Sequence, residues 1–352
     1  MWVIILLKRI KSTILILTAF AAFISPINCF ASVSAASAVV MDAETNTILY
    51  ETNAYDERPM ASTTKIMTAL LACESGKLSQ TVTVTDEMLM GCEGSSVGLR
   101  GGDKITLYDL TVAMLLASGN DAANAVACFL AGTLENFASL MNQRAAEIGM
   151  NNTEFVTPSG LDSGNHHSTA YDMALLAAQA LGNTAFSEIC AMQKCEITIS
   201  GKKQTLYNHN KLLSSMDGCV GVKTGFTEKA GRCLVSAVEY KGNTLICVTL
   251  SDPDDWDDHA SLIKQCKKKY SEKRFASEMQ IPVVGGNEDF VTTCYEYSVI
   301  TVNDEFSQRI FYYPFVYAPV KKGDTLGYVK INNKTVPLKA QEDVKIYGTE
   351  QK

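Results

Sequence analysis

Two kinds of apolar pattern alternate along the chain after residue 36. Short β-rich runs predict strands at Ser37–Asp42 and Thr47–Glu51, and the polar residues between them are typical of a hairpin turn. Longer apolar stretches follow, and glycines such as Gly76 and Gly182 mark their ends. These stretches predict helices at Thr63–Cys73, Leu107–Leu116, Asp121–Ala131, Leu134–Ile148 and Thr169–Leu181.

Strand patterns return in the second half of the chain. They predict a strand at Val220–Thr227, and a second hairpin in which Arg232–Glu239 and Thr244–Leu250 flank a Lys-Gly-Asn turn. A further helix is expected over Asp257–Lys269. Strands therefore open and close residues 37–275, with helices between them. This order favours an α+β domain whose mainly antiparallel sheet is covered by helices, rather than a doubly wound sheet.

The pattern changes again near Phe275. Ile281–Lys352 holds only short β-branched or aromatic runs, separated by clusters of Gly, Asn and Asp. We expect an all-β module at residues 276–352, and about 75 residues make a core small enough to rely on its neighbour.

The N-terminus has the order of a secretory signal. Three basic residues precede the apolar run Thr13–Ile27, and small residues continue through Ala38. Residues 1–36 are therefore expected to be a signal peptide and the rest of the protein extracytoplasmic, although an uncleaved membrane anchor is an alternative. The candidate cleavage points follow Ala31, Ala35 and Ala36.

Charge and composition narrow the function. A net charge of −7 over 352 residues disfavours a nucleic-acid-binding protein, which normally presents a basic face. The four histidines have no ligand spacing with cysteines or carboxylates, so neither a metal nor a cofactor is expected. Eleven cysteines are scattered without C-x-x-C pairs. Secreted chains usually pair their cysteines, yet several here occupy apolar positions, so we expect mostly free, buried thiols and leave one or two disulfides open.

Three short motifs carry the candidate chemistry. Ser62-Thr-Thr-Lys65 and Ser118-Gly-Asn120 follow patterns that recur in the chain, whereas Lys223-Thr224-Gly225 occurs once. The Ser-x-x-Lys pattern, for example, is repeated at Ser200–Lys203 and Ser261–Lys264. No single motif therefore identifies a site, and the information lies in their order and surroundings.

Ser62 and Lys65 are three residues apart, so on a helix their side chains share one face. The residues after Lys65 are nearly all apolar, which predicts a buried helix. Burial lowers the pKa of a lysine, and a second cation such as Lys223 lowers it further. Lys65 then becomes a candidate general base for a nucleophilic Ser62. The alternative is an N-cap serine beside a surface lysine.

The other two motifs offer substrate contacts. Ser118 could relay a proton to a leaving amine and Asn120 could hold a substrate amide, although both are also ordinary helix caps. A glycine within a strand often marks close approach by a ligand or a backbone, so Gly225 points to contact there. Lys223 and Thr224 suit a substrate carboxylate, unless Lys223 is simply solvated. The N–H groups of Phe226 and Ser62 would form an oxyanion hole.

With these motifs in place, residues 37–350 resemble the low-molecular-mass penicillin-binding proteins of the D-alanyl-D-alanine carboxypeptidase family. The resemblance extends to the segments Arg58–Thr68, Gly94–Leu99, Gly101–Asp103, Leu116–Ala122, Thr157–Asp162, His167–Asp172, Asn208–Leu213, Asp217–Gly231 and Ala318–Gly323. It implies a β-lactamase/transpeptidase-like domain followed by a small all-β domain. It also implies a serine D,D-carboxypeptidase that removes the terminal D-alanine from peptidoglycan stem peptides.

The same resemblance assigns roles to the candidate residues. Ser62 would be the acylated nucleophile and Lys65 its proton acceptor, with Ser118 and Asn120 as the second motif. Lys223 and Thr224 would hold the terminal carboxylate of D-Ala-D-Ala. β-Lactams carry a similar carboxylate and carbonyl, so they are expected to acylate Ser62.

Two departures from the family pattern leave questions open. Where many relatives have an arginine, this chain has His209, and Arg232 is a candidate for the missing cation. Many relatives end in an amphipathic membrane-surface helix, and no such segment is recognised before Lys352, so membrane attachment stays open.

The motifs are also compatible with other functions. A D,D-endopeptidase or transpeptidase would use a cross-link or a second amine, and a non-catalytic penicillin-binding or peptidoglycan-sensing protein would only retain the pocket. A β-lactamase is disfavoured, because no clear Glu-x-x-Leu-Asn string for deacylation is found. His167 is interpreted as part of a polar turn rather than as a pocket residue, and the acidic run Asp252–Asp258 as a solvated loop.

Overall fold

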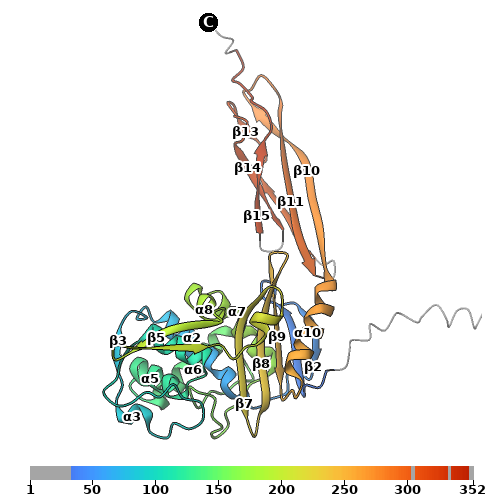
Figure 1. Ribbon diagram of the computed structural model, residues 1–352. Coiled ribbons are helices and arrows are strands. Elements are labelled where there is room, and N and C mark those ends of the chain that lie inside the picture. Colours follow the sequence, from blue (N-terminus) through green and yellow to red (C-terminus); the bar gives the residue numbers. More distant parts are fainter. Residues whose placement is uncertain (1–32, 303–305, 332–333, 349–352) are drawn as a thin grey trace, which may run out of the picture. The chain divides into compact units, whose positions relative to one another are not determined.

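A five-stranded antiparallel sheet forms the centre of the larger region (Figure 1). The computed structural model describes residues 33–302, 306–331 and 334–348. The strand order is β2-β1-β9-β8-β7, and every neighbouring pair is antiparallel. The bounds are β1 Ser37–Asp42, β2 Ile48–Thr52, β7 Cys219–Thr227, β8 Gly231–Tyr240 and β9 Asn243–Leu250. The expected α+β class and the antiparallel sheet are confirmed.

Most helices lie in the long insertion between β2 and β7. A short 3-10 turn, η1, leads directly into α2, and the insertion also contains two small two-stranded sheets, β3–β4 and the hairpin β5–β6. The insertion contains η1 Ala61–Thr64, α2 Lys65–Glu74, β3 Thr81–Thr83, α3 Asp86–Leu89, β4 Lys104–Thr106, α4 Leu107–Leu116, α5 Asn120–Ala131, α6 Leu134–Ile148, α7 Ala170–Leu181, α8 Thr184–Cys190, β5 Lys194–Ile199, β6 Lys202–Tyr207 and α9 Leu212–Ser215.

Side-chain caps fix where several helices begin. The hydroxyls of Thr106, Thr133 and Thr169 accept a hydrogen bond from the third backbone N–H of α4, α6 and α7, which satisfies a donor that the helix leaves free. The same device begins α8, where the Asn183 side chain accepts from the N–H of Phe186 at 3.2 Å. The sequence patterns missed α8, because this helix is only seven residues long.

Both faces of the central sheet are covered. All six residues of β1 are buried, which is possible only when elements lie on each side of the strand. Helix α7 contacts β1 and β9, and α10, Asp255–Cys266, contacts β8 and β9. Helix α2 contacts α4, α5, α6, α7 and α8, so it is the central helix of the insertion. The expectation that the helix after Ser62 is buried is therefore confirmed.

A second, six-stranded sheet follows α10 and the 3-10 turn η2, Lys267–Lys269. Its strands are β10 Tyr270–Val284, β11 Phe290–Val302, β12 Gln308–Tyr312, β13 Val316–Tyr317, β14 Thr325–Ile331 and β15 Lys334–Ala340, in the order β12-β14-β15-β11-β10-β13. Strand β10 begins at Tyr270. The sequence predicted a helix up to Lys269 and a change to β-rich patterns only near Phe275. Its first half is rich in charged and polar residues and mostly exposed, so it carries little apolar periodicity. The expected domain boundary at 275/276 falls within this strand and stays a prediction.

Two other expectations concern the termini and the thiols. The expected signal peptide lies mostly outside the described residues, and none of the helices described is long and apolar enough to cross a bilayer. The ten cysteines within the described part of the chain are all free. Four of them, Cys190, Cys233, Cys247 and Cys266, are buried, and the other six are partly exposed.

Truncation of Leu70 tests the central position of α2. This side chain is fully buried, so Leu70→Ala is expected to lower the free energy of unfolding by about 2–5 kcal/mol. The matched control is Leu140→Ala in α6, where the side chain is 41% exposed and the expected loss is about 0.5 kcal/mol. Urea unfolding followed by circular dichroism measures both, and equal losses in the two variants would contradict this packing.

Candidate active site

The three sequence motifs meet around one groove of 290 Å³. Ser62 comes from η1, Ser118 from the junction of α4 and α5, and Thr224, Gly225 and Phe226 from the edge strand β7. Arg232 on β8 also lines the groove, so six of the nine residues predicted from the sequence face it. The other three are Lys65, Asn120 and Lys223, and they are buried behind its wall.

Lys65 is the most enclosed charged residue of the site. Its Nζ lies 2.8 Å from Ser62 Oγ, 2.6 Å from Asn120 Oδ1 and 2.6 Å from the carbonyl oxygen of Ser159. The side chain is completely buried, and this burial, together with the nearby Lys223 ammonium, holds the pKa of Lys65 well below its usual value. The amine is therefore placed next to the Ser62 hydroxyl in an environment that favours its neutral form.

Ser118 lines the groove, and Asn120 is buried behind it. While Asn120 Oδ1 accepts from Lys65, its Nδ2 donates to the carbonyl oxygen of Glu93 at 2.5 Å, so the amide is held at both ends. Ser118 has a left-handed backbone (φ 60°), which non-glycine residues adopt rarely and which often occurs at functional sites. This turn breaks α4 from α5 and presents Ser118 to the groove.

On β7, Lys223 points inward and Gly225 allows close approach. Lys223 is 1% exposed, and its Nζ donates to the carbonyl oxygen of Thr224 at 2.9 Å. Burial lowers the pKa of Lys223 to about 7. A Cβ at Gly225 would lie 3.1 Å from the backbone nitrogens of both Ser62 and Thr63, closer than ordinary contact. The glycine is needed because the β7 backbone lies against η1 at this point.

Arg232 lies at one end of the groove, where its guanidinium contacts both Asp255 and Trp256. Arg232 Nη2 donates to Asp255 Oδ1 at 2.6 Å, and its guanidinium lies 5.5 Å from the centre of the Trp256 ring. The Nε of Arg232 is buried and has no hydrogen-bond partner among the described residues. His209 lines the same groove, and burial together with Lys223 lowers the pKa of its imidazole. His209 is therefore neutral at pH 7, and Arg232 is the permanent cation at this end.

The acidic run was misinterpreted from the sequence. Asp252 and Asp255 are buried rather than solvated. Asp255 is buried because it pairs with Arg232, 23 residues away in sequence. Asp252 Oδ1 accepts from the Ser34 hydroxyl at 2.7 Å, and burial raises the pKa of its carboxyl to about 6.

His166 is a supporting residue that the sequence did not reveal. Its Nδ1 accepts from the backbone N–H of Val156 at 2.9 Å, so its Nε2 carries the proton and donates to Thr64 Oγ1 at 2.8 Å. Burial lowers the pKa of His166 to about 4, which keeps the ring neutral. The ring thus ties the loop that contains Ser159 to η1. His167, in contrast, bonds the carbonyl oxygen of Asn165 within a turn, as expected.

The Asp121 side chain holds the 94–99 segment in place through several hydrogen bonds. Its carboxylate accepts hydrogen bonds from the Ser96 hydroxyl at 2.6 Å and from consecutive backbone N–H groups, those of Val97 at 3.1 Å, Gly98 at 2.9 Å and Leu99 at 3.1 Å. The contact joins residues more than twenty positions apart, so no local pattern predicted it. It holds the 94–99 segment, which includes the groove residue Ser95, against the start of α5.

Comparisons with known proteins agree with this arrangement. A family model described as D-alanyl-D-alanine carboxypeptidase (Peptidase_S11) matches residues 25–254. The D-alanyl-D-alanine carboxypeptidase DacF of Bacillus subtilis is 31% identical over 337 residues, covering 89% of this chain and 87% of that protein. DacB2 of Mycobacterium tuberculosis is 33% identical over 232 residues, covering 64% and 79%.

Solved structures give the same result. The crystal structure of the D-alanyl-D-alanine carboxypeptidase DacD from Francisella tularensis superimposes with a TM-score of 0.63 at 26% identity, covering 90% of this chain and 95% of that one. A Streptomyces DD-transpeptidase reaches 0.64 at 30% identity, covering 68% and 98%.

Fold and relatives together define a serine-type peptidase of the penicillin-binding class. The chain belongs to the D-alanyl-D-alanine carboxypeptidase family. The resemblance drawn from the sequence motifs is therefore confirmed.

Replacement of Asp121 tests the hold on the 94–99 segment. An amide at this position keeps one acceptor oxygen but turns the other into a donor facing backbone N–H groups. Asp121→Asn is expected to lower stability by about 1–3 kcal/mol and to raise the hydrogen-exchange rates of the Val97, Gly98 and Leu99 amides. Asp56→Asn serves as the control, because this exposed carboxylate pairs, among the described residues, only with Arg58 at 3.4 Å. Unchanged exchange in Asp121→Asn would refute the proposed hold.

Proposed function

We propose that the protein removes the terminal D-alanine from peptidoglycan stem peptides through an acyl-enzyme on Ser62. The observation that supports this most directly is the 2.8 Å separation of Lys65 Nζ and Ser62 Oγ. Lysine is a useful base near neutral pH only when its environment lowers its pKa, and complete burial does so here. Ser62 itself lines the groove, so the nucleophile is open to substrate while its base is not.

The groups around the groove support a sequence of proton transfers. Neutral Lys65 accepts the Ser62 proton as Oγ attacks the scissile carbonyl carbon. The backbone N–H groups of Ser62 and Phe226 stabilise the developing oxyanion, each by about 3 kcal/mol. Ser118 passes a proton to the leaving amine, the C–N bond breaks, and D-alanine departs. Water then hydrolyses the ester and regenerates Ser62.

Substrate orientation follows from the polar groups on β7 and β8. Asn120 holds the amide on the acyl side, and the Thr224 hydroxyl donates a hydrogen bond to the terminal carboxylate on the leaving side. Lys223 is too buried to pair directly with that carboxylate and acts by lowering the Lys65 pKa and by fixing the Thr224 backbone. Arg232 supplies a guanidinium donor for the carboxylate, because its Nε is without a partner among the described atoms while its Nη2 stays paired with Asp255.

The family and the N-terminal pattern support an extracytoplasmic enzyme. Its substrate lies outside the cytoplasm, and residues 1–36 would deliver the chain there as a secretory signal. β-Lactams present a carbonyl and a carboxylate in a similar arrangement, so they would acylate Ser62 as substrate analogues.

The nucleophile is tested with a fluorescent penicillin. The wild-type protein is expected to become covalently labelled, and Ser62→Ala, which has no hydroxyl to acylate, is expected to stay unlabelled. Ser200→Ala keeps Ser62 and changes the serine of a second Ser-x-x-Lys motif, so it should label fully. Labelling of Ser62→Ala at the wild-type level would remove the catalytic assignment.

The role of Arg232 is tested with paired substrates. Arg232→Gln is expected to reduce kcat/KM for a D-Ala-D-Ala peptide about tenfold, because a charge-assisted hydrogen bond to the carboxylate is lost. The same peptide ending in D-alaninamide lacks that charge and should lose much less. The readout is release of D-alanine from the first peptide and of D-alaninamide from the second, and equal losses with both peptides would place the carboxylate elsewhere.

A further inference from the structure

Three residues that precede β1 are bonded to parts of the chain that lie far away in sequence. We call Ser34, Ala35 and Ala36 the N-terminal strap. The Ala36 N–H donates to the carbonyl oxygen of Ser251 at 3.0 Å, and the Ala36 carbonyl oxygen accepts from Asn53 Nδ2 at 2.9 Å. The strap is therefore joined to the catalytic region before the first strand begins, although it belongs to none of the three motifs.

Ser34 supplies a hydrogen bond to each of two carboxylates. Its hydroxyl donates to Asp252 Oδ1 at 2.7 Å, and its backbone N–H donates to Asp258 Oδ2 at 2.6 Å. The hydroxyl oxygen in turn accepts from the backbone N–H of Asp254 at 3.3 Å. Asp252 is fully buried, and its Oδ2 has no hydrogen-bond partner among the described residues. Because a buried carboxylate with few donors is costly, the Ser34 hydroxyl matters for the path of this segment.

The two carboxylates lie at the ends of the 252–258 segment, which positions Arg232. Between them, Asp255 Oδ1 accepts from Arg232 Nη2 at 2.6 Å, and the Trp256 ring lies 5.5 Å from the guanidinium. The Asp252 N–H also donates to the carbonyl oxygen of Arg232 at 2.9 Å. The backbone and the side chain of Arg232 are therefore both held by the segment that Ser34 bonds at its two ends.

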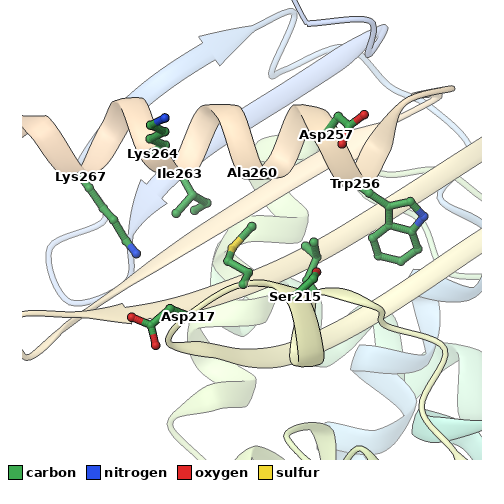
Figure 2. Close-up of a pocket in the computed structure, with 10 residues that line it drawn as sticks. Ser215, Asp217, Trp256, Asp257, Ala260, Ile263, Lys264 and Lys267 are labelled. Carbon is green, nitrogen blue, oxygen red and sulfur yellow. The ribbon is translucent and has the colours of Figure 1, made fainter.

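Helix α10 begins inside this segment, and its first turn sets the direction of the Trp256 ring. The Trp256 side chain extends toward the side of the 212–217 segment, whereas Asp257 extends away from it (Figure 2). Trp256 also lines the active-site groove. A displacement of the start of α10 would therefore move the ring that lies against the guanidinium of Arg232.

We propose that Ser34 is a positioning residue for the end of the groove at which the substrate carboxylate binds. It bonds both ends of the 252–258 segment, and that segment holds the guanidinium of Arg232 in the groove. Ser34 is not among the residues that line the groove, so it acts through Arg232. The inference rests on the proposed function, in which Arg232 binds the carboxylate of D-Ala-D-Ala.

This role limits where the expected signal peptide can be removed from a functional enzyme. A signal peptidase would hydrolyse one peptide bond with one water, leaving a carboxylate before the cut and an ammonium after it. A cut after Ala35 or Ala36 removes Ser34, whereas a cut after Ala31 keeps the whole strap. The bond that follows Ala31 is therefore the expected one, and it lies outside the described residues.

Removal of the Ser34 hydroxyl tests the positioning role. Ser34→Ala keeps the backbone N–H but takes the hydroxyl donor from Asp252. We expect KM for a D-Ala-D-Ala peptide to rise about threefold with kcat unchanged, and the peptide that ends in D-alaninamide to be unaffected. Ser34→Thr supplies a hydroxyl again and should restore KM. Ser139→Ala, which removes an exposed hydroxyl from α6, is the matched control and should change neither peptide.

Hydrogen exchange provides a readout that needs no catalysis. The Asp252 amide, which bonds the Arg232 carbonyl oxygen, is expected to exchange faster in Ser34→Ala and at the wild-type rate in Ser34→Thr. Unchanged exchange, unchanged KM or equal losses with both peptides would overturn the inference and leave the proposed function standing. A wild-type protein that releases no D-alanine would instead refute the proposed function, while the exchange rates still test the hold on Arg232.

Mass spectrometry of the secreted protein tests the cleavage point. The full chain, expressed with its own N-terminus, is expected to yield a mature protein that begins at Ser32. An active mature protein that begins at Ala36 or Ser37 lacks Ser34 and would show that the strap is dispensable.

Discussion

The site depends on the burial of one amine. Lys65 has three oxygen partners, from Ser62, Asn120 and Ser159, and each comes from a different part of the chain. A buried ammonium without a full counter-charge is costly, so the surroundings shift the equilibrium of Lys65 toward its neutral form. The fold is arranged to keep water from this amine while Ser62 remains accessible.

Much of the supporting structure can be understood as maintenance of that enclosure. The His166 ring ties the Ser159 loop to η1, and the Glu93 carbonyl holds the far side of the Asn120 amide. Gly225 lets β7 approach η1 closely enough to close the remaining side. Lys223 contributes a second buried amine, whose charge raises the energy of protonated Lys65. All of these contacts help to keep Lys65 Nζ in its neutral form.

The sequence predicted what depends on local patterns and missed what depends on distant partners. The motif Lys223-Thr-Gly and the apolar run after Lys65 singled out Ser62 among three Ser-x-x-Lys copies, and in the structure Ser62 lies beside a buried lysine. The structure explains the difference, because the Lys203 of another copy is exposed and pairs with Glu196. The antiparallel sheet and the main helices followed from periodicity in the same way.

Long-range pairing accounts for the errors. Asp255 was taken for part of a solvated run because nothing near it in the sequence indicates that Arg232 will neutralise it. His166 carries no ligand spacing, and its function appears only when Thr64, 102 residues earlier, lies beside it. Strand β10 was missed for another reason, because the polar and charged residues Ser271–Arg274 occupy both faces of the strand and remove the apolar–polar alternation that identifies a strand.

The buried cysteines have a consequence for how the protein matures. Disulfide exchange proceeds through the thiolate, and burial raises the pKa of Cys190, Cys233 and Cys266 to about 12. At neutral pH these sulfurs are therefore almost entirely protonated, and the folded core shields them from oxidants. The packing around these three cysteines therefore does not depend on their pairing, and the folded state itself preserves them as thiols.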